Sequence, residues 1–175
     1  MVKIRNMQER EAERVRDLWL QMCEQTGTPL PDASAQLILA NLKQYAAHQM
    51  VHCFIAEESH SIIGFVTCSV TGHPVMPGLT GDIEELYVQP DPHRHAVQVD
   101  LVRQAVIFMK ELGAGNIHTR ICVGNECPEE NEMRTFWQSL GWENDMTIYS
   151  IYSNVPGDPD LQRIWDEYQV RSETA

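Results

Sequence analysis

Three basic or titratable side chains, His93, Arg94 and His95, stand together in a short turn of the sequence. The turn follows a strand-like run, Ile83–Val88, and precedes a long amphipathic segment typical of a helix. A tight turn from a strand into a helix leaves the first backbone N–H groups of the helix without partners in the helix, and the helix dipole adds partial positive charge there. The pattern predicts a site for a phosphate-bearing ligand where this helix begins.

A second group with chemical potential lies on the strand, where Glu84 and Glu85 precede Tyr87. A carboxylate that faces a cleft can accept a proton from a substrate, directly or through water. Because side chains alternate along a strand, we expect Glu84 on one face and Glu85 with Tyr87 on the other. Two adjacent glutamates at a strand start are also typical of a solvated edge, and this interpretation stays open.

Other chemistries find weaker support. A metal site built on His93 and His95, with His73 or a cysteine, lacks the spacing of structural zinc ligands, so we expect no metal. Cys122 and Cys127 are weak candidates for a nucleophile, because the sequence spacing predicts no histidine next to either of them that could act as its base. Nothing in the sequence resembles a G-x-S-x-G turn or a P-loop.

The periodicity of the chain predicts the order β-α-α-β-β-β-α-β-α-β and therefore an α/β fold, a mixed and mostly antiparallel sheet flanked by helices. The unit from Ile83 to Val123 predicts a parallel, right-handed crossover. The expected strands are 2–5, 51–56, 62–70, 83–88, 117–123 and 147–152, and the expected helices besides the long one are 9–25, one after the N-cap Asp32, and 129–140. We expect one domain over residues 1–153 and a tail, 154–175, that forms a further helix on the domain or on a second subunit.

The amino-acid composition restricts the classes of molecule that we expect the protein to bind. The chain has 13 Lys and Arg against 25 Asp and Glu, a formal charge of −12, which disfavours nucleic acid and anionic membranes and favours cationic small molecules. No apolar run approaches the length of a membrane span, and the N-terminus has no secretory pattern. The five scattered cysteines indicate buried free thiols in a reducing cytoplasm.

The element order, the strand IEELYV and the turn behind it resemble the core of the GNAT superfamily of N-acetyltransferases over roughly residues 1–152. In that family two strands splay apart, acetyl-CoA enters the gap, and a turn reading Q/R-x-x-G-x-G/A holds its pyrophosphate. The resemblance implies that acetyl-CoA binds here as a co-substrate. The corresponding turn is His93, Arg94, His95, Ala96, Val97 and Gln98.

The resemblance also implies roles on the strand. The backbone of Leu86, Tyr87 and Val88 would hold the pantetheine arm and polarise the thioester. Glu85 is then the first candidate for the proton acceptor, because it is expected to share a face with Tyr87, and Glu84 is the second.

Two positions depart from the family pattern. Ala96 and Gln98 replace the two small residues of the turn, and the long side chain of Gln98 is expected to lie across the phosphate path. Many members carry N-x-x-A-x-x-L-Y-x-x-x-G-F in a late helix; Trp137 stands where their tyrosine falls, and Asn131 lies one position off their asparagine. The proton donor is left open among Tyr87, Tyr149 and Tyr152.

Together these features predict a cytoplasmic N-acetyltransferase that moves an acetyl group from acetyl-CoA to the primary amine of a small, cationic acceptor. The alternative is a catalytically degenerate GNAT-fold binding or regulatory module that no longer binds acetyl-CoA, which the replacements at Gln98 and Trp137 favour. A pocket of this kind could also take another acyl-CoA. By analogy with the family we expect a homodimer.

Overall fold

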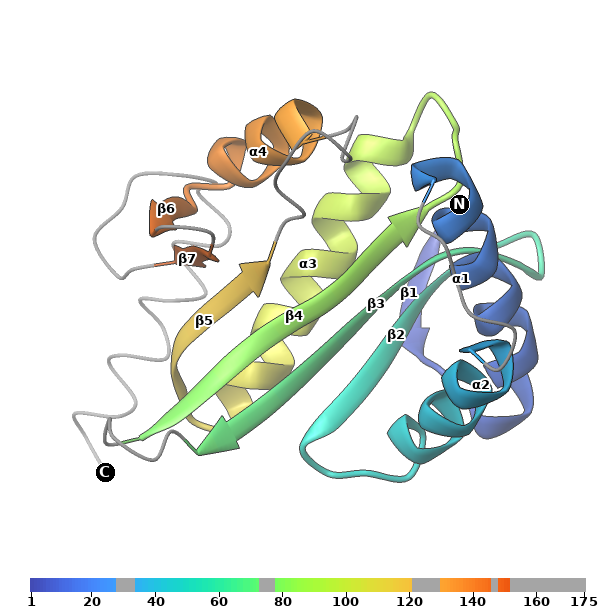
Figure 1. The fold of residues 1–175 in the computed structure, drawn as a ribbon, viewed down its shortest axis with the longest axis horizontal. Helices are drawn as coiled ribbons and strands as arrows, with labels where there is room; N and C mark the ends of the chain where they lie inside the picture. The colour runs from blue at the N-terminus through green and yellow to red at the C-terminus, as the bar shows by residue number, and fades with distance from the viewer. Residues whose placement is uncertain (28–33, 73–77, 121–129, 146–147, 152–175) are drawn as a thin grey trace. The chain divides into compact units, whose positions relative to one another are not determined.

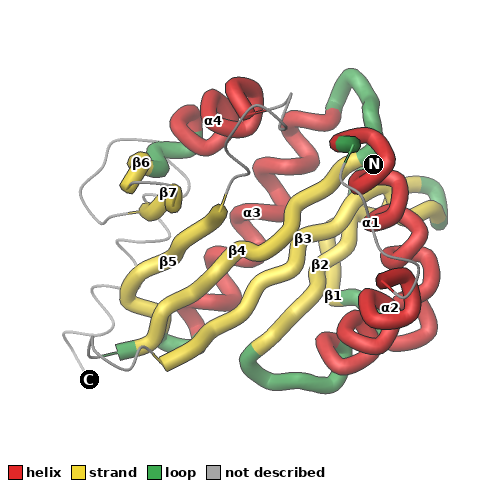
Figure 2. Tube along the Cα trace, viewed as in Figure 1, coloured by secondary structure: helices red, strands yellow, loops and turns green. Residues whose placement is uncertain are grey.

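A computed structural model gives the structure of the protein and describes residues 1–27, 34–72, 78–120, 130–145 and 148–151. The strands are β1 (Lys3–Asn6), β2 (Val51–Glu58), β3 (Ser61–Gly72), β4 (Leu79–Val88), β5 (Ala114–Arg120), β6 (Glu143–Asp145) and β7 (Ile148–Ile151). The helices are the 3-10 turn η1 (Glu9–Glu11), α1 (Ala12–Thr26), α2 (Ser34–Tyr45), α3 (Arg94–Glu111) and α4 (Glu130–Ser139) (Figures 1 and 2). The predicted order is confirmed, with η1 and β6 added to it.

The strands pair in the order β1-β2-β3-β4-β5-β7-β6. Strands β1, β2 and β3 pair antiparallel, whereas β4 and β5 pair parallel, which confirms the parallel direction predicted for the crossover through α3. Its right hand stays a prediction. Strand β5 begins at Ala114, three residues before the predicted start, because its pairing with Leu79 draws the glycine-containing segment into the sheet. Among the described residues, the β4–β5 pairing ends at Ile83, and β4 continues to Val88 beyond it.

The hairpin between β2 and β3 is tighter than predicted. The expected loop spans Glu57 to Ser61, but only Ser59 and His60 lie outside the strands. Both have positive φ, 48° and 69°, the conformation of the two-residue turn whose twist matches that of antiparallel strands.

The chain divides into two compact units, and strands β3 and β4 and helix α3 contribute to both. The first unit contains Met1–Ser69 and Glu84–Ala105, and the second contains Val70–Ile83 and Val106–Ala175. The predicted single domain over 1–153 stays a prediction, and the predicted helical tail lies outside the described residues.

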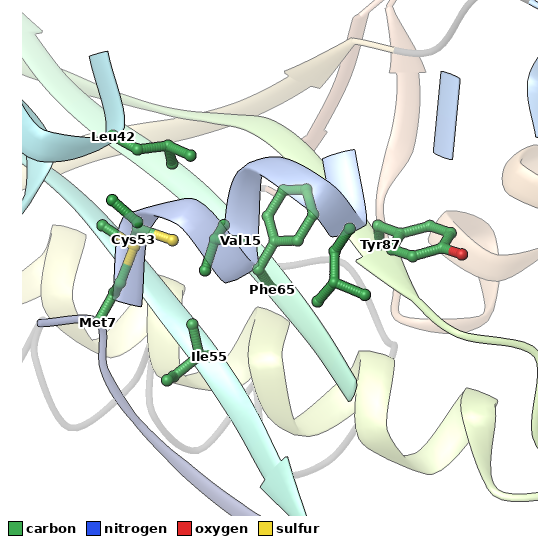
Figure 3. Packing of buried hydrophobic residues seen from close by; sticks show 9 residues of the cluster. Met7, Val15, Leu42, Cys53, Ile55, Phe65 and Tyr87 are labelled. Carbon is green, nitrogen blue, oxygen red and sulfur yellow. The ribbon is translucent and has the colours of Figure 1, made fainter. Parts of the chain in front are cut away.

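The core of the first unit holds helices α1 and α2 against one face of strands β2, β3 and β4 (Figure 3). Along this face the Phe65 ring stacks on Trp19 at 5.6 Å and tilts against Tyr87 at 6.2 Å between ring centroids. The buried members of this cluster are Met7, Ala12, Val15, Leu18, Leu42, Cys53, Ile55, Phe65 and Tyr87. In the first half of α3, four apolar side chains are buried: Val97, Leu101, Val102 and Ala105.

The second unit has an aromatic cluster around α4. Phe136 and Trp137 are buried, and the Trp137 ring lies 4.8 Å from that of Trp142 between centroids. Both α4 aromatics therefore act as core residues. Separately, Cys23, Cys53 and Cys68 are buried free thiols, as predicted, whereas Cys122 and Cys127 lie outside the described residues.

A charge network fixes the N-terminus of the chain on the sheet. The Arg5 guanidinium donates to both carboxylate oxygens of Glu11, at 2.8 and 2.7 Å, and to Glu57 at 2.7 Å. Glu11 also accepts from the backbone N–H of Gln8 at 2.9 Å, which completes a capping box for η1. The hydrogen bond from Arg5 is the largest cause that lowers the pKa of Glu11 below its ordinary value.

Replacing Glu11 by Gln should lower the free energy of unfolding by roughly 1–3 kcal/mol at pH 7, because a charge-assisted hydrogen bond to a largely buried side chain is lost. A carboxyl with a lowered folded-state pKa stabilises fully above its unfolded-state pKa and loses that contribution as the pH falls through its folded-state pKa. The difference from wild type should therefore shrink below about pH 4.5. Denaturant unfolding measured at both pH values tests this, with the exposed Glu13→Gln as control. Equal losses at both pH values would contradict the account.

Candidate active site

The turn before α3 is held by Asp91. Its carboxylate accepts the N–H of His93 at 2.7 Å, and its backbone carbonyl accepts the N–H of Arg94 at 2.9 Å. The first bond of the helical ladder runs from the N–H of Val97 to the carbonyl of His93 at 3.2 Å. The N–H groups of His95 and Ala96 lie in the first turn of α3, the part of a helix at which anions bind.

The side chains of the turn divide into exposed and buried groups. His93, His95 and Ala96 are exposed, and Val97 is buried. Arg94 is half-buried, and its Nε is shielded from solvent with no hydrogen-bond partner among the described residues. A buried N–H of a guanidinium without an acceptor is costly, and a phosphate oxygen would satisfy it.

Gln98, near the start of α3, is 8% exposed and is therefore buried. The long side chain of Gln98 therefore occupies space in the protein that the short side chain of a glycine or alanine would leave free. Whether its amide crosses the path of a phosphate stays a prediction.

The end of β4 lies in close contact with β3. The N–H of Gln89 donates to the carbonyl of Ile63 at 2.9 Å. Gly64 lies next along β3, and a Cβ added there would meet the carbonyl oxygen of Tyr87 at 2.7 Å and a methyl of Val88 at 2.8 Å. Only glycine allows this approach, so Gly64 sets where the backbone of Tyr87 and Val88 lies. Leu86 is half-buried, and Tyr87 and Val88 are buried.

The Glu84 carboxylate is held by two hydroxyl groups. The Tyr45 hydroxyl of α2 donates to its Oε2 at 2.8 Å, and the Ser69 hydroxyl of β3 donates to its Oε1 at 2.7 Å. Neither donor is predictable from the strand motif, because Tyr45 lies 39 residues and Ser69 15 residues away in the sequence.

The predicted alternation of faces along β4 is wrong between Glu84 and Tyr87. Ser69 follows Phe65 by four residues on a regularly paired stretch of β3, so both face the same way. Glu84 bonds to Ser69 and the Tyr87 ring contacts Phe65, which places residues three apart on one side of the sheet. An irregularity in the strand, as in a β-bulge, shifts the alternation in this manner.

Glu85 lies beside Glu84 and is half-buried. Burial, and second the charge of Glu84, raises the pKa of the Glu85 carboxyl to about 7. The charge of Glu85 in turn contributes to raising the pKa of Cys23 in α1 and of Tyr45 in α2. A carboxylate that ionises near neutral pH is well suited to accept and release protons.

Tyr87 is 3% exposed, and its hydroxyl donates to the side-chain oxygen of Gln25 at the end of α1, at 3.2 Å. This partner was not predicted. Asn131 is exposed on α4 in the second unit, and its backbone carbonyl accepts from Thr135 at 2.7 Å. Tyr149 lies in β7 of the same unit, and Tyr152 lies outside the described residues.

We also searched the part of the chain that the structure describes for metal sites and for membrane-spanning helices. There, no three His, Cys, Asp or Glu side chains gather in a group that could hold a metal ion. His73, the third ligand of the metal interpretation, lies outside that part. None of the helices in the described ranges combines the length and the apolar character that crossing a membrane requires.

Comparison with known proteins identifies the class. The sequence model of the acetyltransferase (GNAT) family matches residues 12–142. No curated protein matches the chain. The protein belongs to the GNAT family of acetyltransferases.

Solved structures share the fold at low sequence identity. An acetyltransferase from Clostridium acetobutylicum, solved with acetyl-CoA, is 16% identical with a TM-score of 0.69, covering 83% of this chain and 92% of its own. One from Arthrobacter sp. FB24 is 19% identical with a TM-score of 0.68, covering 88% and 89%. An aminoglycoside N-acetyltransferase in complex with CoA is 20% identical with a TM-score of 0.67, covering 82% and 89%. At this level of identity the likeness concerns the fold.

Proposed function

We propose that the protein is an N-acetyltransferase that moves an acetyl group from acetyl-CoA to the primary amine of a small, cationic acceptor. The observation that carries the proposal is Glu85, a carboxylate with a pKa raised to about 7, on the strand that leads into the anion-binding turn of α3. A family-model match over residues 12–142 and CoA-bound proteins of the same fold support acyl-CoA as the co-substrate.

The transfer needs a neutral amine, a polarised thioester and a leaving thiolate. Glu85 takes the proton of the ammonium group, and the amine nitrogen then attacks the thioester carbon. Backbone N–H groups within Leu86–Val88 stabilise the oxyanion, which is the role of preorganised donors. Collapse of the intermediate breaks the carbon–sulfur bond, releases the CoA thiolate and leaves an N-acetylated product; the extra proton of the amide nitrogen passes to solvent or to the thiolate.

Charge favours a cationic acceptor. The chain has a net charge of −12, and the Glu84–Glu85 pair lies at the proposed reaction centre. A protonated amine is attracted to such a centre, whereas an anionic acceptor is repelled. An aminoglycoside N-acetyltransferase among the similar structures is consistent with amine acceptors of this kind.

A thiol-release assay with acetyl-CoA and a panel of amines tests the proposed function. We expect CoA release that depends on a cationic primary amine and whose kcat/KM rises with pH through about 7, as Glu85 loses its proton. Release with none of the amines, or equal release with anionic amines, would contradict the proposal. A cytoplasmic location and a homodimer stay predictions.

Arg94→Ala should raise the Kd for acetyl-CoA about tenfold, because one charge-assisted hydrogen bond to phosphate is lost, which corresponds to about 1.4 kcal/mol. Arg14→Ala removes an exposed arginine from α1 and serves as the matched control. Isothermal titration calorimetry measures both. Equal affinities for wild type and Arg94→Ala would remove Arg94 from the binding site.

The presence of Gln98 where the family has a glycine or alanine favours one alternative, a GNAT-fold binding or regulatory module without acetyl-CoA binding. Gln98→Gly and Gln98→Ala separate the two functions in the same titration. If only these variants bind acetyl-CoA, the chain is such a module; if wild type binds, it is not. Alanine is the milder probe, because glycine within a helix costs roughly 1 kcal/mol relative to alanine.

A further inference from the structure

Both oxygens of the Glu84 carboxylate are engaged from two different elements. Tyr45 donates from the last residue of α2, and Ser69 donates from β3. A carboxylate bonded to one donor can still rotate about its last torsion, but two donors on its two oxygens fix its plane and its position. The Glu84 side chain is therefore held beside Glu85 although residue 84 is exposed to solvent.

We propose that Tyr45 and Ser69 are positioning residues whose hydroxyl groups hold the Glu84 carboxylate next to Glu85, so that Glu84 controls when Glu85 accepts a proton. The inference rests on the proposed function, in which Glu85 takes the proton of the amine. It assigns different roles to the adjacent glutamates: Glu85 exchanges the proton, and Glu84 supplies a fixed negative charge.

Electrostatics agree with this division. The charge of Glu84 is one of the causes that raise the pKa of Glu85, after burial. Like charges side by side disfavour the ionised form, and the effect falls with distance, so it depends on where Glu84 is held. Without the two hydroxyls the Glu84 carboxylate would be able to turn toward solvent. That movement weakens the field at Glu85 and lets Glu85 ionise at lower pH.

Three thiols and one phenol in this region stay neutral over the relevant range. Cys23 in α1, Cys53 in β2 and Cys68 in β3 are buried thiols whose pKa values are raised by burial. The pKa of the Tyr45 hydroxyl is raised by burial and by its hydrogen bond to Glu84. None of these four groups changes its ionisation between pH 5 and 8, so none of them obscures the titration of the Glu85 carboxyl.

The test is a carbon-13 NMR titration of the glutamate carboxyl groups in the free, full-length protein, without acetyl-CoA or amine. Glu84→Gln should lower the titration midpoint of Glu85 by about one pH unit from its value of about 7. Tyr45→Phe with Ser69→Ala should lower it by a similar amount. In that double variant a further Glu84→Gln should change the midpoint by less than half of its effect in wild type, because Glu84 is no longer held.

Ser61→Ala removes an exposed hydroxyl at the start of the same strand and should leave the midpoint unchanged. Where the double variant does not fold, the conservative Tyr45→Phe and Ser69→Ala carry the same test singly. An unchanged midpoint in folded Tyr45→Phe and Ser69→Ala, or a full Glu84→Gln effect in the double variant, would overturn the positioning role.

The titration does not depend on transfer. Failure of the thiol-release assay with a shifted midpoint would refute the proposed function and leave the positioning role intact. If the wild type transfers the acetyl group but the variants leave the Glu85 midpoint unshifted, the proposed function stands and the positioning role is refuted. In an active enzyme, the kcat/KM profile of the double variant should move to lower pH by the same amount as the midpoint.

Discussion

Glu85→Gln should reduce kcat/KM for acetyl transfer by about 10²–10⁴-fold, the typical contribution of a positioned general base. Glutamine keeps the size of the side chain but cannot accept the amine proton. The rise of kcat/KM with pH through about 7 should disappear with the carboxyl group. The affinity for acetyl-CoA should stay close to that of wild type, because the phosphates are proposed to bind at residues 93–98, which follow β4, and not at Glu85 on that strand.

The same substitution should stabilise the protein at high pH. The folded-state pKa of Glu85, about 7, lies above the ordinary value of 4.5, so the folded protein binds the proton more tightly than the unfolded chain does. The resulting penalty is absent below pH 4.5, grows up to pH 7 and is complete above it. At about 1.4 kcal/mol per pKa unit, Glu85→Gln should gain up to about 3 kcal/mol at pH 8 and almost nothing at pH 4.5.

Thermal unfolding at the two pH values, together with the thiol-release assay, measures both effects on one variant. Lower activity with higher stability is the expected pattern for a group held in an unfavourable environment for function. Full activity with an unchanged pH profile would show that the proton acceptor is another group. Glu84→Gln provides the contrast, since it should keep the pH-dependent rise but move it to lower pH.

Gly64→Ala should both destabilise the protein and weaken acetyl-CoA binding. The added Cβ would lie 2.7 Å from the carbonyl oxygen of Tyr87 and 2.8 Å from a methyl of Val88, contacts that force strands β3 and β4 apart. Overpacking of this kind costs roughly 1–3 kcal/mol. Because the shifted backbone is the one proposed to hold the pantetheine arm, the Kd for acetyl-CoA should rise at least about tenfold in the folded fraction.

Gly72→Ala is the matched control, because Gly72 ends the same strand and a Cβ there meets nothing within 4 Å. Denaturant unfolding and calorimetric titration of the two variants separate a local effect from the general cost of replacing a glycine. If Gly64→Ala were as stable as Gly72→Ala and bound acetyl-CoA equally well, the close approach of β3 to β4 would have no part in the site.

Sequence periodicity predicted the fold because each element carries its own pattern. An amphipathic stripe marks α1, and the run IEELYV before a proline-bounded turn marks the crossover from β4 into α3. Boundaries set by pairing between distant segments were less predictable. Strand β5 begins at Ala114, against the tendency of the neighbouring glycines, because β4 offers it a hydrogen-bonding partner.

The site was predictable only along the local motif. Glu85 followed from its place on the strand, but Tyr45 and Ser69 reach Glu84 from elements distant in sequence, and no local signal marks them. The expectation that Glu84 and Tyr87 face opposite ways failed for a similar reason. A regular period of two assumes an unbroken strand, and β4 shifts its alternation between Glu84 and Tyr87.

The central claim is that the first turn of α3 binds the phosphates of an acyl-CoA. The most direct measurement is a nitrogen-15 amide spectrum of the labelled protein during titration with acetyl-CoA. The account predicts that the amides of His95 and Ala96, in the first turn of α3, show the largest changes and that Arg94→Ala reduces them. Binding that leaves these amides unmoved, or no spectral change at millimolar acetyl-CoA, would contradict it.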